Sequence, residues 1–128
     1  MSYYFSCKLD TSMHEAREHV AAALGEEGFG VLTEIDVQET LKKKIGAEWP
    51  GYKILGACNP KFAHKALQAE PHIGTMLPCN VILRELDDGQ IEVSAVDPLA
   101  SMQSVNNLDL GAVATEVRDK LRQVIESL

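Results

Sequence analysis

The triplet Asp87-Asp88-Gly89 most constrains how this chain can fold, because it places a tight turn between two apolar segments. Segment 79–86 is strongly apolar, and Ile91, Val93 and Ala95 alternate with polar residues after the turn. Asp-Gly between two apolar segments is typical of a tight hairpin turn. The two segments are therefore predicted to be antiparallel neighbours, which argues against a doubly wound parallel sheet.

The remaining elements follow from periodicity and from capping residues. Strands are predicted at 3–9, 29–37 and 52–58, where apolar and aromatic residues are frequent or alternate with period two. Helices are predicted at 13–25, after Ser12-Met13-His14-Glu15, and at 37–45, ending at Gly46. A third helix is predicted at 59–69, and segments 72–78 and 99–107 are expected to be loops.

The last helix has the clearest pattern of the chain. Its apolar residues fall on one stripe at helical spacing, with charged residues on the other side. The stripe consists of Leu110, Val113, Ala114, Val117, Leu121, Val124, Ile125 and Leu128. We therefore expect this helix to supply a main part of the core.

The predicted order is strand, helix, strand, short helix, strand, helix, strand, strand, helix. This order favours an α+β fold, with a single antiparallel sheet and helices packed on one face. The 128 residues, with no linker and no internal repeat, are expected to form one domain spanning 1–128.

Charge and composition narrow the classes of partner. The formal net charge of −7 argues against nucleic acid and against an anionic membrane surface. No apolar run approaches the roughly 18 residues that span a bilayer, and the N-terminus lacks the pattern of a secretory signal. We therefore expect a soluble cytoplasmic protein whose three cysteines are thiols.

Two Cys-Asn pairs mark the candidate functional site. Cys58-Asn59 ends an apolar strand and is followed by Pro60, while Cys79-Asn80 opens another strand after Pro78. If these strands are antiparallel neighbours, the end of one meets the start of the other. The two sulfur atoms are then expected to lie close together at one edge of the sheet. Asp97, before Pro98, is a further candidate for the same pocket.

Each candidate also has a purely structural interpretation. Free cysteine is a small apolar residue that is often buried. Asn59 suits the N-cap of a helix that begins at Pro60, Asn80 suits a strand edge, and Asp97 suits a strand-ending turn. A zinc site built from the cysteines with His64 and His72 is disfavoured, because the close-paired spacing of zinc ligands is absent. No cofactor, metal or catalytic residue is predicted.

The two cysteine segments carry a resemblance to a known family. The run 53–67, containing Gly-Ala-Cys-Asn-Pro, and the run 73–81, containing Leu-Pro-Cys-Asn-Val, resemble the family "domain of unknown function 302", as does Val96-Asp97-Pro98. The resemblance covers nearly the whole chain. It implies a small α+β fold similar to the TATA-binding-protein-like group, often as a dimer, and no established reaction.

Three functions are compatible with these observations. The first is a non-enzymatic binding module, with a pocket for a small apolar or anionic ligand at the Cys58/Cys79 edge. The second is a thiol-dependent redox protein, or a sulfur or acyl carrier, in which Cys58 is the nucleophile and Cys79 the resolving partner. The third is a structural or assembly protein that acts as a homodimer. The sequence favours the first, because its spacing reveals no acid–base pair.

Overall fold

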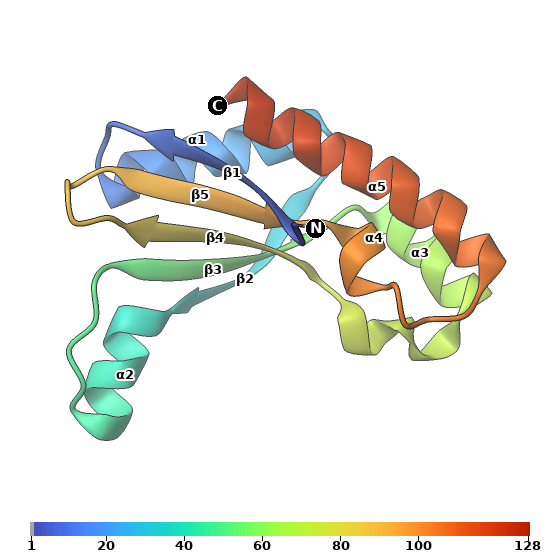
Figure 1. Ribbon diagram of the computed structural model, residues 1–128, viewed down its shortest axis with the longest axis horizontal. Helices are drawn as coiled ribbons and strands as arrows, with labels where there is room; N and C mark the ends of the chain where they lie inside the picture. The colour runs from blue at the N-terminus through green and yellow to red at the C-terminus, as the bar shows by residue number, and fades with distance from the viewer. Residues whose placement is uncertain (1) are drawn as a thin grey trace.

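The computed structural model describes residues 2–128, which form one five-stranded antiparallel sheet with helices (Figure 1). The strands are β1 (Tyr4–Leu9), β2 (Gly30–Asp36), β3 (Tyr52–Cys58), β4 (Cys79–Glu85) and β5 (Ile91–Val96). Their order across the sheet is β1-β5-β4-β3-β2. The α+β class and the antiparallel hairpin at Asp87-Asp88-Gly89 are confirmed, and Gly89 adopts the left-handed φ of 86° that this turn needs.

The helices are α1 (Met13–Glu26), α2 (Val37–Ile45), α3 (Pro60–Ala69), α4 (Pro98–Ser101) and α5 (Leu108–Ser127), with a 3₁₀ helix, η1, at Pro71–Met76. Two predicted loops therefore contain helical turns. Segment 72–78 is mostly η1, whose start is capped by the Glu70 carboxylate, and segment 99–107 includes most of α4. Short helices of this kind lack the extended periodicity from which longer ones are recognised.

Two helix caps differ in detail from the prediction. The sequence Ser12-Met13-His14-Glu15 predicts a capping box at α1, in which Ser12 accepts from the backbone N–H of Glu15 and the Glu15 carboxylate accepts from the backbone N–H of Ser12. Ser12 makes the first of these bonds, but the Glu15 carboxylate accepts from the Thr11 hydroxyl at 2.6 Å. At α3, Asn59 holds the N-cap position without capping the helix. Its side-chain amide donates instead to the Glu27 carbonyl at 3.2 Å. The helix is thereby tied to the turn between α1 and β2.

The main core lies between α1, α5 and one face of the sheet. Its largest fully buried side chains include Leu24 on α1, Leu55 and Leu83 on neighbouring strands, and Leu121 on α5. From Val117 onward, the stripe predicted for the last helix faces this core. A second, smaller apolar cluster joins the first half of α5 to α3, η1 and α4 through Ala66, Ile73, Met102, Leu110 and Ala114.

The two ends of the sheet are built differently (Figure 1). α3, η1, α4 and the start of α5 gather at one end, while α2 projects from the other. No residue of α2 is buried, although Val37, Leu41 and Ile45 share one side of it. Among the helices of residues 2–128, none is both long and apolar enough to cross a membrane.

Candidate functional site

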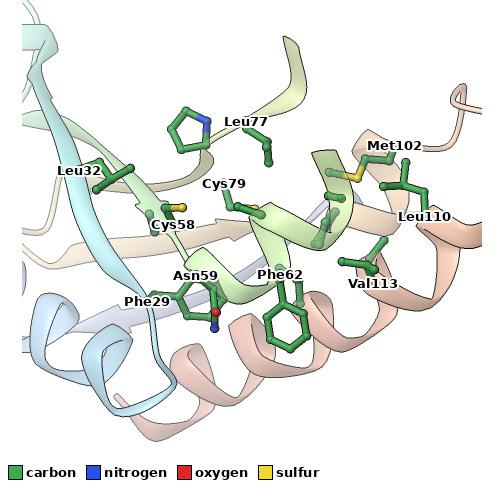
Figure 2. A pocket seen from close by; sticks show the side chains of 17 residues that line it. Phe29, Leu32, Cys58, Asn59, Phe62, Leu77, Cys79, Met102, Leu110 and Val113 are labelled. Carbon is green, nitrogen blue, oxygen red and sulfur yellow. The ribbon is translucent and has the colours of Figure 1, made fainter. Parts of the chain in front are cut away.

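An apolar pocket of about 270 Å³ lies where the two core clusters meet (Figure 2). Its walls come from the start of β2, the end of β3, the start of β4, and helices α3, α4 and α5. Four alanines, Ala57, Ala63, Ala66 and Ala114, contribute to these walls. Their short side chains leave space that larger residues would fill, because interiors otherwise pack closely.

Strand pairing brings the two predicted cysteines together. Ala57 on β3 is the register partner of Cys79 on β4, so Cys58 is the residue next to that partner. Both residues line the pocket, Cys79 from the helix-covered face of the sheet and Cys58 from the end of its strand. Figure 2 shows Leu32 and Cys58 at one end of the pocket, with Met102 and Leu110 at the other.

The two thiols differ in burial. Cys79 is only 7% exposed and Cys58 is half-buried. Burial, with a smaller electrostatic contribution from the neighbouring Cys58, raises the pKa of the Cys79 thiol to about 11. Cys79 is therefore protonated at neutral pH, because a buried thiolate loses its hydration. Cys7 lies outside the pocket in β1, and burial also raises its pKa.

The other three predicted residues have different positions. Asn59 lines the pocket, but its amide is occupied by the Glu27 carbonyl. Asn80 lies on the opposite face of the sheet, because side chains alternate along β4 and Cys79 faces the helices. Asp97 does not line the pocket; its carboxylate accepts from the backbone N–H of Leu99 and caps α4. Its neighbour Pro98 contributes to the wall instead.

Most of the pocket wall was not predicted as a site. Phe62, Leu77, Met102 and Val113 are ordinary apolar residues on elements far apart in the sequence. The only available signal was the high alanine content of α3 and the apolar stripe of α5, and both are equally typical of a filled core.

The wall is chemically uniform. Asn59 and the two thiols are its only polar side chains, and no Asp, Glu, Lys, Arg or His side chain is among the lining residues. A buried anion without a paired charge or hydrogen-bond donors is strongly disfavoured. The pocket therefore suits a neutral apolar molecule better than the anionic alternative raised from the sequence. Among residues 2–128, no group of three or more His, Cys, Asp or Glu side chains could hold a metal ion.

Comparison with known proteins agrees with this fold. The sequence profile described as "Domain of unknown function DUF302" matches residues 5–128. A crystal structure titled as an uncharacterized conserved protein DUF302 from Bacillus stearothermophilus is similar to this chain, with a TM-score of 0.91 and 25% sequence identity over 98% of both chains. Among curated proteins, none matches.

Proposed function

The chain belongs to the family described as Domain of unknown function DUF302, and on the geometry of its pocket we propose that it is a non-enzymatic binding module for a small apolar molecule. The family description assigns no activity, so the proposal depends on the site. One observation carries it: an apolar cavity of about 270 Å³ with no charged lining residue. Ligand sites are concave and mostly apolar, with few polar groups.

The surrounding contacts support a preformed site. Asn59 ties the start of α3 to the α1–β2 turn, and Asn107 donates to the Ala69 carbonyl at 2.8 Å, which ties the end of α3 to the start of α5. These two hydrogen bonds hold α3, one wall of the pocket, at both ends. A wall held in this way loses little conformational entropy when a ligand enters.

Ligand-dependent stabilisation tests the proposal with 1-octanol as a neutral probe. A molecule that binds only the folded state raises stability, by about 2.7 kcal/mol at one hundred times its Kd. We expect the melting temperature to rise with octanol concentration in wild-type protein and to rise less in Ala63→Leu, which fills the pocket. Ala22→Leu is the matched control, because Ala22 is exposed on α1. Equal shifts in the two variants, or no shift in wild type, would contradict the proposal.

A second candidate function, assembly as a homodimer, is favoured by the uncovered face of the sheet. Tyr4, Tyr52, Ile82 and Val96 surround a hollow on this face, and no helix residue lines it. Tyrosine and arginine are enriched at protein interfaces. Arg84 lies in the same hollow and is paired with Glu92 at 2.6 Å.

Charge and size fit a second copy of this chain. The charged side chains that alternation puts on this face are Lys8, Arg84 and Glu92, so the face is nearly neutral on a molecule of net charge −7. Two like-charged copies meet most favourably through such a patch. Strand spacing and the rise per residue give the face of five strands of about six residues a flat area of roughly 500 Å². The side chains that project from it increase the surface that can be buried. That approaches the roughly 800 Å² per partner of a standard interface.

We also propose a fold group and a cellular compartment for this protein. The order of elements, with α2 and α3 as insertions, supports the arrangement of the TATA-binding-protein-like group. The three free cysteines support a reducing compartment such as the cytoplasm.

A further inference from the structure

One end of the pocket holds the only reactive groups in its wall. Cys58 and Cys79 are the only ionisable side chains among the lining residues. Cys79 is more than nine-tenths buried, and its thiol has no hydrogen-bond partner among residues 2–128. Cys58 is more accessible and lies toward Leu32, which is itself exposed. Of the two sulfurs, Cys58 is therefore the one that can attack a bound molecule.

The backbone after Cys58 is suited to developing negative charge. α3 begins at Pro60, and Asn59 gives its side chain to Glu27 instead of to the helix. The N–H groups of Lys61 and Phe62 consequently have no acceptor among the residues that the structure describes. Unpaired N–H groups at a helix N-terminus stabilise an anion beside them.

We propose that the pocket captures apolar α,β-unsaturated aldehydes and ketones by covalent addition to Cys58. This inference depends on the proposed binding function, because the same apolar wall holds the carbon chain. The Cys58 thiol gives its proton to water, its sulfur forms a bond to the β-carbon as the electron pair of the carbon–carbon double bond moves to give an enolate, and the α-carbon then takes up a proton from water. The net reaction adds the thiol S–H across the double bond, so that no oxidant, reductant or leaving group is involved.

The lining residues favour this class over other thiol chemistry. Acyl transfer needs a general base to activate the water that releases the acyl group from the thiol, and no His, Asp or Glu side chain lines the wall. Disulfide exchange needs a second thiolate to release the product, and Cys79 remains protonated at neutral pH. Addition to an enal or enone needs only a nucleophile, an apolar wall and stabilisation of one oxygen.

A series of trans-2-enals tests the proposal on the intact chain. 2-Butenal, 2-hexenal and 2-octenal carry the same reactive group on chains of increasing length. We expect the second-order rate constant at Cys58, measured by mass spectrometry of peptides, to rise about threefold to fourfold per added methylene, the gain from burying one methylene. Cys7, and Cys58 in urea-unfolded protein, should show no such rise.

A variant pair separates capture in the pocket from simple accessibility. Ala63→Leu should slow octenal addition at Cys58 by a larger factor than it slows acrylamide addition, and Ala22→Leu, on the exposed side of α1, should change neither rate. Equal rates for butenal and octenal at Cys58 in the folded protein would overturn the proposal, whatever the variants do. If octanol still raised the melting temperature in that case, this inference would fail while the binding function stood. If octanol had no effect, both would fail.

Discussion

Cys79 shows how one buried thiol couples the pocket to the stability of the fold. Its register partner Ala57 and its neighbour Val81 place it on the helix-covered face, where water cannot solvate a thiolate. The pKa of this thiol is about 11 in the folded protein, against an ordinary value of 9.0. The folded state therefore holds this proton more tightly than the unfolded state does.

This difference gives a stability that depends on pH in a defined direction. A raised folded-state pKa contributes fully below pH 9 and is lost as pH rises toward 11, since the unfolded chain ionises first. A difference of two pKa units corresponds to about 3 kcal/mol at the high-pH limit. We expect urea titrations at pH 8–11 to show a steeper alkaline loss of stability for wild type than for Cys79→Ala. Parallel pH profiles for the two proteins would show that Cys79 does not titrate in this way.

At the scale of elements, α5 connects the two apolar clusters and forms a wall of the pocket. Leu121 lies on its sheet-facing side and is 0% exposed, whereas Leu110 and Ala114 belong to the cluster with α3 and η1. A single helix thus fixes the distance between the core and the helices that surround the pocket.

Truncation of Leu121 measures the contribution of this helix to the core. Leu121→Ala should lower the free energy of unfolding by about 2–5 kcal/mol, because it removes buried methyl groups and leaves a cavity. Leu108→Ala is the control on the same helix, since Leu108 is 95% exposed. Chemical denaturation measures the free energy of unfolding of both variants. A loss below about 1 kcal/mol for Leu121→Ala would mean that the apolar stripe of α5 contributes little to the stability of the core.

Elements with an extended periodic pattern or a clear capping residue were predictable from the sequence, whereas the pocket was not. The α5 stripe, the Asp88-Gly89 turn and the α2 stop at Gly46 depend on local patterns that packing does not override. Leu67, by contrast, follows Ala63 by four residues, at the spacing of a helix face that lines the pocket, and is nevertheless exposed. The pocket depends on how α3 sits against α5, and no local pattern encodes a distance between helices. The adjacency of Cys58 and Cys79 was predictable only because it follows from strand register.

On the scale of the whole molecule, helices cover only one of the two faces of the sheet. α1 and α5 cover one face, and the other carries tyrosines, Ile82 and the Arg84–Glu92 pair. Contiguous apolar surface of this kind is commonly an interaction site. The uncovered face and the pocket lie on different parts of the molecule, so assembly and binding can be tested independently.

Sedimentation equilibrium tests assembly through this face. We expect a mass of two chains for wild type at tens of micromolar and of one chain for Ile82→Arg, because an unpaired charge at the centre of an interface is costly. Tyr4→Glu, at the rim, serves as a second variant if Ile82→Arg misfolds. Leu67→Glu places a charge on an exposed residue elsewhere and should leave the mass unchanged. A single-chain mass for wild type, or a dimer that survives both substitutions on the face, would contradict the proposal.

The central claim is that the space between α3, α5 and the end of the sheet holds a small apolar molecule. Methyl-resolved NMR during a titration with 1-octanol tests it most directly, because it locates the probe as well as measuring its affinity. We expect saturable shifts at Ala63, Ala66, Leu77 and Val113, with Leu32 affected at the mouth and Leu108 unchanged. Shifts confined to the uncovered face, around Ile82 and Val96, or shifts that do not saturate, would contradict it.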